Sequence, residues 1–326
     1  MEHEGQIGLF GAAGAAGQSI AHALSAAGRP YRVIGRGQAA LRASYGHDPL
    51  AEIVTWNPED PASIAAAAAG LQTAVYLVGM PYDQFAQHPA LMQKTLDGLR
   101  AAGVQRLILI GTVYPYGRAH SQPVTESHPR EPHTFKGKMR LAQENLVIDA
   151  HGRSGLESLV LRLPDFYGPG VERSFLHGVF TGATLSKRAQ MIGPIDVPHE
   201  FVFMPDVGPV VERLSRTPEA FGRVLHLAGT GTITQREIAA RAYALAQREP
   251  KLMVANKTML RVMGLFDPML RELVEMHYLL TEPVVLDDTA LTTLIGPIRK
   301  TSYEAGIAQS FAAAQRLRRH AAAQAA

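Results

Sequence analysis

Residues 7–17 read IGLFGAAGAAG, so that Gly11, Gly14 and Gly17 follow directly on a short apolar run. The apolar run has the length of a buried strand, and the Ala-rich residues 18–27 have the composition of a helix. Glycines at this spacing allow a tight turn, close approach of the backbone to a ligand, and close packing of the helix on the strand. Because the first N–H groups of a helix bind phosphate, this order predicts a dinucleotide site near the N-terminus.

The composition is that of a folded enzyme-sized chain. It has 326 residues, 46% of them hydrophobic, a net charge of +3 and no cysteine. A chain of this length buries a large core, and without cysteine it forms neither disulfides nor thiolate metal sites. It has no apolar run of about 18 residues, its first residues are acidic, and its basic cluster at 316–320 is typical of a solvated helix end. We therefore expect a cytoplasmic protein with a small-molecule substrate and no nucleic-acid or membrane partner.

Up to about residue 165 the chain alternates between apolar runs and segments of helical length. This alternation predicts an α/β fold with a doubly wound parallel sheet. Beyond Gly168 helical stretches dominate, at 235–247 and 258–280. We expect a dinucleotide-binding domain over residues 5–168 and a smaller mixed C-terminal substrate lobe over 169–326, with some of its segments returning to the sheet. The runs that suit buried strands are residues 31–34, 52–55, 74–78, 106–110 and 158–161.

The end of the second predicted strand bears on the choice of cofactor. In NAD-binding folds an acidic residue at this place accepts hydrogen bonds from the adenosine ribose. Here Gly35 takes that position and Arg36 follows it. A guanidinium forms charge-assisted contacts with a 2′-phosphate, which a carboxylate would repel. The sequence therefore favours NADP(H) over NAD(H).

Several later segments resemble the extended short-chain dehydrogenases/reductases, the group of NAD-dependent epimerases and dehydratases. The resemblance implies a Rossmann fold, and it runs from residue 6 to about 312 in the order of the family's motifs. The matching segments are the glycine turn, Asn57 with DPAS at 60–63, VGM at 78–80, GTVYPYG at 111–117, RLPDFYGPG at 162–170, FVFMPDV at 201–207 and TSYEAG at 301–306.

The resemblance also implies which residues contact the cofactor. They belong to the glycine turn, to the segments that follow the second to fourth strands, to the predicted catalytic helix, and to the segment after residue 162. These residues are Gly11, Ala13, Gly14, Ala15, Ala16, Gly17, Arg36, Asn57, Pro58, Val78, Gly79, Met80, Lys136, Arg140, Pro164 and Phe166.

The family's catalytic pattern is altered in this chain. Members place a Ser or Thr after strand five, which Thr112 matches, and a tyrosine followed four residues later by a lysine on the next helix. Residues 136–144 read KGKMRLAQE, so alignment on Glu144 puts Lys136 at the tyrosine position and Arg140 at the lysine position. No tyrosine in the chain is followed by a lysine four residues later. A shift of register therefore does not restore the motif.

Three interpretations of the altered motif remain. Lys136 and Arg140 share a helix face, and since arginine keeps its proton, Lys136 would be the group that transfers one. Alternatively, both residues only hold the cofactor or face solvent. Tyr114 is a second candidate acid, because it lies two residues after Thr112 and an extended strand end would aim both side chains to the same side. The histidines at 120, 128 and 133 lack metal-ligand spacing, so we expect no metal.

The sequence thus favours an NADP(H)-dependent oxidoreductase or epimerase that transfers hydride at a hydroxyl or carbonyl carbon of a small substrate. The alternative is a dinucleotide-binding protein that has lost turnover and works as a redox sensor or binding partner. The resemblance also implies a homodimer through the predicted helices at 84–102 and 136–151. Their apolar positions include Leu91, Leu96, Leu99, Leu141, Leu146 and Ile148.

Overall fold

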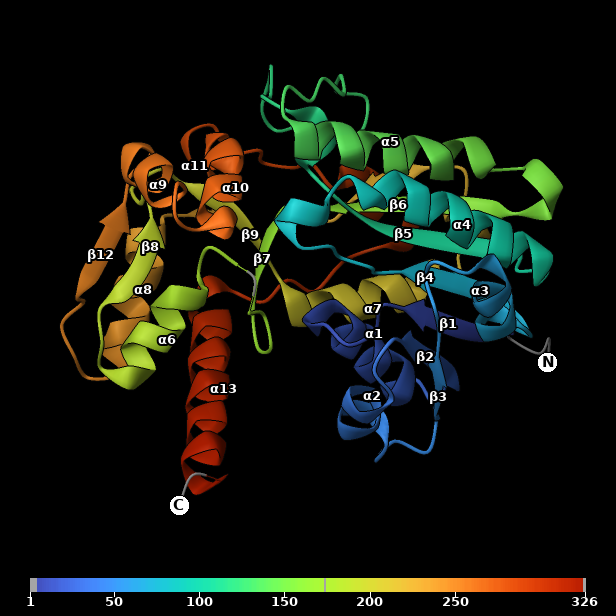
Figure 1. Cartoon of the computed structure of the whole chain (residues 1–326), viewed down its shortest axis with the longest axis horizontal. Helices are drawn as coiled ribbons and strands as arrows, with labels where there is room; N and C mark the ends of the chain where they lie inside the picture. The colour runs from blue at the N-terminus through green and yellow to red at the C-terminus, as the bar shows by residue number, and fades with distance from the viewer. Residues whose placement is uncertain (1–4, 173, 325–326) are drawn as a thin grey trace.

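A seven-stranded parallel sheet forms the centre of the computed structural model, which describes residues 5–172 and 174–324 (Figure 1). The strand order is β10-β6-β5-β4-β1-β2-β3, and every neighbouring pair is parallel. The predicted α/β class with a doubly wound sheet is confirmed. The strands are β1 Gln6–Phe10, β2 Tyr31–Gly35, β3 Ala51–Thr55, β4 Leu71–Tyr76, β5 Arg106–Thr112, β6 Glu157–Leu163 and β10 Val224–His226.

Helices cover both faces of this sheet, and each face has its own buried apolar cluster. One cluster joins the sheet to α1, α2, α7 and α12, and the other joins it to α3, α4 and α5. Parallel strands buried on both faces account for the nearly continuous apolar runs of the sequence. These helices are α1 Ala15–Ala26, α2 Gln38–Tyr45, α3 Pro61–Ala68, α4 Gln87–Ala101, α5 Phe135–Ala150, α7 Met204–Leu214 and α12 Thr289–Ile295.

The second part of the molecule, at the left of Figure 1, has its own small sheets and core. One sheet has the order β11-β9-β7, and β12 pairs with β8 in the other. The strands are β7 Asp165–Tyr167, β8 Ala189–Ile192, β9 His199–Phe203, β11 Thr232–Ile233 and β12 Leu252–Ala255. The helices are α6 His177–Leu185, α8 Gln235–Leu245, α9 Lys257–Met263, α10 Pro268–Met276, α11 Tyr278–Thr281 and α13 Tyr303–Gln324. Short 3₁₀ turns lie at η1 Tyr82–Gln84, η2 Tyr114–Tyr116, η3 Arg153–Gly155 and η4 Pro218–Ala220.

The chain passes between the two parts more than once. After β9 it returns to the large sheet, where α7 packs on α1 and β10 pairs with β6. Residues 204–226 therefore belong to the part built on the large sheet although they follow residue 168. The boundary expected from the sequence, between residues 168 and 169, stays a prediction.

The segment 258–280, expected to be helical, is divided in the structure. The first helix, α9, ends at Met263, and α10 begins only at Pro268. Proline has no N–H to continue a helix, and the Asp267 side chain accepts the N–H of Met269 at 2.8 Å as an N-cap. The two helices consequently fold back on each other as a hairpin.

Two glycines allow α1 to be packed tightly. A Cβ at Gly17 would lie 2.2 Å from the carbonyl oxygen of Ala12 in the preceding turn. A Cβ at Gly208 would lie 2.1 Å from the carbonyl oxygen of Ser19, where α7 crosses α1. Both distances are far below van der Waals contact, so only glycine allows these elements to approach so closely.

Candidate active site

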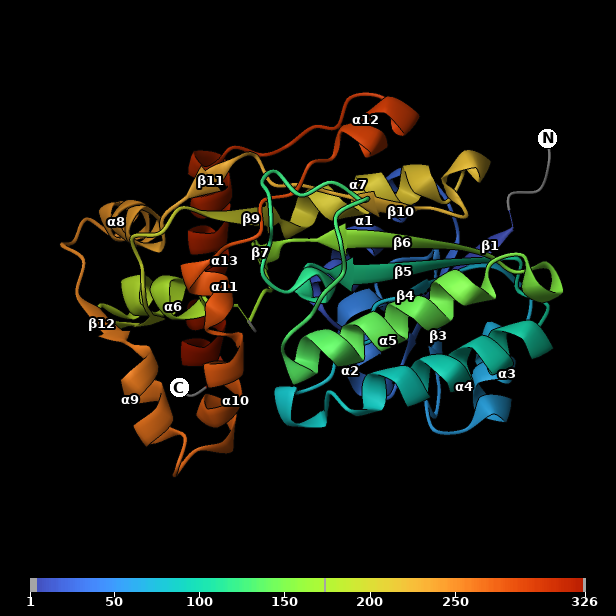
Figure 2. The same cartoon turned by 90° about the horizontal axis from the view of Figure 1, so that it is seen from above.

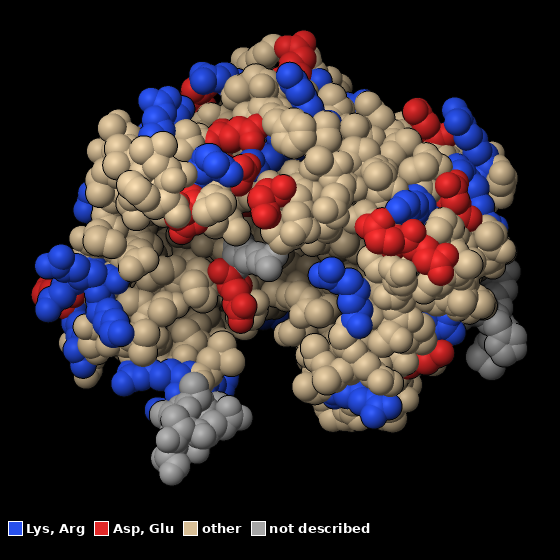
Figure 3. All heavy atoms as spheres, in the orientation of Figure 1, with Lys and Arg blue, Asp and Glu red and all other residues tan. Residues whose placement is uncertain are grey.

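A cleft of about 1110 Å³ lies at the carboxyl ends of the parallel strands. Figure 3 shows the surface hollowed between the two parts of the molecule. The sheet order reverses at β1, whose neighbours are β4 and β2, and such a switch point is where open α/β sheets bind ligands. A smaller hollow of about 520 Å³, beside Tyr31 and Tyr45, shares only Gln18 with the cleft. The large cleft is therefore the candidate site.

The glycine turn forms one end of the cleft. Gly11 has a φ of 88°, and a Cβ there would lie 3.0 Å from the backbone of Val78. Gly14 is the N-cap of α1, where no side chain caps the first turn. The first N–H groups of α1 are therefore open to a ligand, and the positive end of the helix dipole favours an anion there. This is the geometry of a pyrophosphate site.

Most of the cofactor contacts expected from the sequence are brought together. Of the sixteen residues, fourteen line the cleft, and Gly17 and Lys136 do not. Gly17 lies within the first turn of α1, on its buried side, where its role is packing. Sequence reasoning missed Trp56 and a group on α13, of which Arg316 and Leu317 are members. No local signal identifies that group, because only the tertiary fold brings α13 to the cleft.

Arg36 lies at the adenosine end that the fold defines, directly after β2, and its side chain is exposed at the cleft. The acidic residues in the described lining are Glu172 and Glu59, whose carboxylate pairs with Lys94. The guanidinium of Arg36 is therefore at the cleft, and Gly35 stands at the end of β2, where NAD-binding folds place the carboxylate that binds the adenosine ribose.

Thr112 and Arg140 lie at the other end of the cleft. Thr112 closes β5, and its Oγ1 accepts the N–H of Tyr114 at 3.3 Å. Arg140 comes from α5, donates to Gln143 Oε1 at 2.8 Å, and lies 5.5 Å from the centre of the Phe85 ring. Burial lowers the pKa of Arg140. Its Nε is buried and has no hydrogen-bond partner within the described residues.

Lys136 has a different environment, because its side chain is fully buried outside the cleft lining. Its Nζ donates to Glu275 Oε2 at 2.6 Å and to Glu272 Oε2 at 2.5 Å, both on α10. Its backbone N–H also donates to Glu275, at 3.1 Å. The residue therefore ties α5 of the large domain to α10 of the second part. The proton-transfer role expected for Lys136 stays a prediction.

Tyr114 is paired with a second phenol. Its Oη lies 3.1 Å from Oη of Tyr82, and the ring of Tyr82 lies 5.5 Å from Nζ of Lys136. Tyr114 is 8% exposed, and burial raises its pKa well above the ordinary value. This buried phenol is therefore a weaker acid than an exposed tyrosine, and like Lys136 it is not among the residues that line the cleft.

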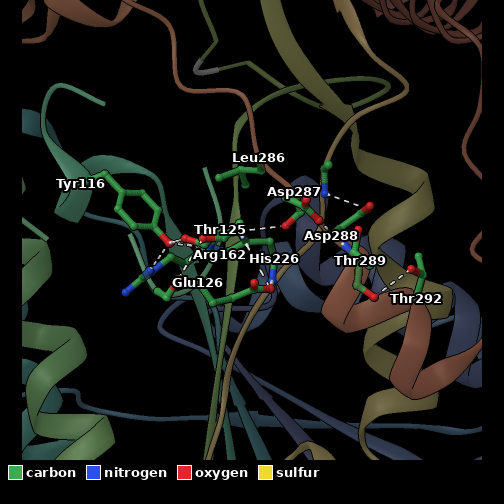
Figure 4. A network of polar contacts seen from close by, with 12 residues as sticks. Tyr116, Thr125, Glu126, Arg162, His226, Leu286, Asp287, Asp288, Thr289 and Thr292 are labelled. Atoms are coloured by element: carbon green, nitrogen blue, oxygen red, sulfur yellow. Dashed lines mark hydrogen bonds and ion pairs between the residues drawn. The ribbon is translucent and has the colours of Figure 1, made fainter. Parts of the chain in front are cut away.

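A buried polar network holds α5 and the turn after β5 against the sheet (Figure 4). Arg162 on β6 donates its Nε to Glu144 Oε1 at 2.9 Å, and Glu144 lies one helical turn after Arg140. Tyr116 Oη meets Nε2 of His226 at 2.5 Å, and burial lowers the pKa of His226 to about 4. The neutral imidazole can then share this hydrogen bond without adding charge beside Arg162. Through Glu144 the network anchors α5, the helix that carries Arg140, to β6.

Comparison with known proteins places this site in a family. Residues 7–228 match the model of the NAD dependent epimerase/dehydratase family, so the chain belongs to that family, whose members are enzymes of the short-chain dehydrogenase/reductase type. The resemblance stated from the sequence is thereby confirmed. No curated protein sequence matches the chain.

Solved structures confirm the fold. The UDP-glucuronic acid 4-epimerase of Bacillus cereus in complex with NAD superposes with a TM-score of 0.78 at 15% identity, covering 96% of this chain and 99% of that one. The dTDP-glucose 4,6-dehydratase DesIV of Streptomyces venezuelae, with NAD and TYD bound, gives a TM-score of 0.79 at 18% identity, covering 97% and 98%.

The assembly expected from the sequence stays a prediction. Leu91, Leu96 and Leu99 on α4 are buried, and Leu96 and Leu99 belong to the core of their own sheet. Ile148 on α5 remains exposed. Among the described helices, none is long and apolar enough to cross a membrane. Nor do three or more His, Cys, Asp or Glu residues in the described ranges converge as metal ligands.

The link between α5 and α10 can be tested through stability. We expect Lys136→Met to lower the free energy of unfolding by about 2–4 kcal/mol, because a buried ammonium is removed and two carboxylates lose their partner. Urea denaturation measures the change. Lys138→Met, on the exposed side of the same helix, is the matched control. Equal stabilities of the two variants would contradict the link.

Proposed function

We propose that this chain is a hydride-transfer oxidoreductase or epimerase that acts on a hydroxyl or carbonyl carbon of a small substrate. The observation that carries the proposal is the shape of one cleft. The glycine turn and the uncapped start of α1 form one end of it, and Thr112 and Arg140 form the other. Membership of the epimerase/dehydratase family supports the same reaction type. The dinucleotide, when bound, supplies or accepts the hydride.

The chain's own residues would bind and orient the reacting groups. The N–H groups at the start of α1 would bind the pyrophosphate. Arg140, which lines the cleft, would hold the nicotinamide ribose, as the family's lysine does. The Thr112 hydroxyl at the end of β5 would hydrogen-bond the substrate oxygen and so orient the carbon for hydride transfer.

A proton must also move at the substrate oxygen, and Tyr114 is the group that we propose for it. Its neighbour Tyr82 provides a second hydroxyl at 3.1 Å through which the proton can be replaced. Neither Tyr114 nor the other candidate, Lys136, is among the residues that line the cleft, but Tyr114 follows the lining residue Thr112 by two positions, whereas Lys136 donates to two carboxylates. These positions favour Tyr114, and the variants below test both residues.

A second candidate function is a dinucleotide-binding protein without turnover. It is favoured by the same observation on Lys136, which takes the tyrosine position of the family motif and is ion-paired to Glu272 and Glu275. Hydride exchange between the reduced cofactor and a broad panel of ketones, alcohols and sugar nucleotides separates the two functions. The absence of exchange with every compound would favour the binding protein.

We further propose that the cofactor is NADP(H). The two solved structures described above contain NAD, but this chain places Gly35 and the exposed Arg36 where an acidic residue would bind the ribose. Arg36 at the edge of the cleft is suited to a 2′-phosphate.

The cofactor preference can be measured by calorimetry. We expect NADPH to bind at least about tenfold more tightly than NADH, since a hydrogen bond to a charged group contributes roughly 1.5–3 kcal/mol. Arg36→Ala should remove most of this difference, whereas Arg42→Ala, an exposed arginine on neighbouring α2, should leave it unchanged. Equal or tighter binding of NADH by the unmodified chain would refute the preference.

Turnover of the variants identifies the proton donor. Tyr114→Phe should reduce kcat by about 10²–10⁴-fold, the usual effect of losing a general acid, with little change in cofactor affinity. Thr112→Val should also lower kcat because the substrate oxygen loses its hydrogen bond. Steady-state kinetics on a reactive carbonyl measures both effects. If Tyr114→Phe is as active as the unmodified chain and Lys136→Met is inactive but folded, the role belongs to Lys136.

A further inference from the structure

Exposed apolar side chains gather in one short segment. Thirteen large hydrophobic side chains are exposed in the described part of the chain, and eight of them fall within residues 253–269. Scattered exposed hydrophobic residues are normal on a protein surface, whereas a contiguous group marks an interaction site. The eight are Met253, Val254, Met259, Val262, Met263, Leu265, Phe266 and Met269.

The most exposed of these residues form the end of a projection. Figure 2 shows α9 and α10 extending from the body, with their connecting loop outermost. In this loop Leu265 is 79% exposed and Phe266 is 87% exposed. We call this apolar loop, residues 264–267, the hairpin tip.

The hairpin of α9 and α10 is packed firmly against the rest of the protein, so its tip is exposed in the folded state. On its inner side Leu260 and Met276 are buried. Gly264 lets the two helices approach closely, since a Cβ there would lie 2.8 Å from the backbone of Arg271. Glu272 and Glu275 of α10 hold the buried Lys136. A loosely packed segment would have none of these contacts.

The two helices beside the tip carry the cations Lys257, Arg261 and Arg271. The acids of the same segment are already in use, since Asp267 is the N-cap of α10 and Glu272 and Glu275 hold the buried Lys136. Arg271 lies 3.9 Å from Glu272, so the positive charge beside the apolar loop is that of Lys257 and Arg261 on α9.

We propose that the hairpin tip docks on the surface of an anionic lipid bilayer. Leu265 and Phe266 enter the boundary between headgroups and acyl chains, and the cations beside them contact the anionic headgroups. A stable dimer through this region would need about 800 Å² from each partner, which favours a broad complementary surface over a narrow projection. A fluid lipid surface, in contrast, admits a projecting tip without a matching shape.

This proposal revises the expectation of no membrane partner. That expectation depended on the absence of an apolar run long enough to span a bilayer. Docking at the interface requires only a small apolar group with adjacent positive charge. The proposal does not depend on the function proposed above, because it makes no use of the cleft.

Cosedimentation with lipid vesicles tests the proposal on the full chain. We expect binding to vesicles that contain one-third phosphatidylglycerol in phosphatidylcholine, and much weaker binding to pure phosphatidylcholine. Replacing both Leu265 and Phe266 by Ser should weaken binding by about tenfold or more, because the buried apolar area is lost. The matched control is Leu245→Ser, which changes a 47% exposed leucine on α8 and should have no effect.

A charge variant tests the second element of the proposal. The double change Lys257→Gln and Arg261→Gln should reduce affinity for the anionic vesicles by about fivefold for each charge, and high salt should have a similar effect. Failure to bind the anionic vesicles, or an equal loss in Leu245→Ser, overturns the proposal. A dimer in sedimentation velocity that the Leu265 and Phe266 changes abolish also overturns it, because the tip would then be an interface between copies.

Discussion

The packing of α1 against its neighbours is the constraint on which the site depends. Gly17 lets the helix lie on the carbonyl oxygen of Ala12, and Gly208 lets α7 press on α1 from the other side. Held in this way, the uncapped first turn of α1 faces the carboxyl ends of the strands, where a helix N-terminus favours an anion. A side chain at either glycine would displace the helix and with it the phosphate site.

The other end of the site depends on buried charge. Arg162 and Glu144 join β6 to α5 within the large domain, and Lys136 joins the same helix to Glu272 and Glu275 on α10. Buried ion pairs of this kind contribute less to stability than to fixing one arrangement of the elements that they connect. Here α10 joins the apolar hairpin tip to α5, the helix that carries Arg140.

The features that could be predicted have local signals in the sequence. The phosphate-binding turn is encoded by the spacing of Gly11, Gly14 and Gly17, and the cofactor preference was inferred from Arg36, directly after β2. Each of these signals lies within a few consecutive residues. The break between α9 and α10 also had local signals, Gly264 and Asp267 before a proline, but the apolar pattern of the whole segment concealed them. The partners of Lys136 and the approach of Arg316 to the cleft could not be predicted, because residues more than 130 positions apart in sequence are brought together only by folding.

We propose that this cleft binds a nicotinamide dinucleotide in one defined orientation. A crystal structure of the chain with NADP⁺ is the most direct test. We expect the pyrophosphate at the N–H groups that begin α1, the 2′-phosphate beside Arg36, and the nicotinamide ring near Thr112 and Arg140. A dinucleotide bound in the reverse orientation, or in the smaller hollow beside Tyr45, would contradict this binding mode.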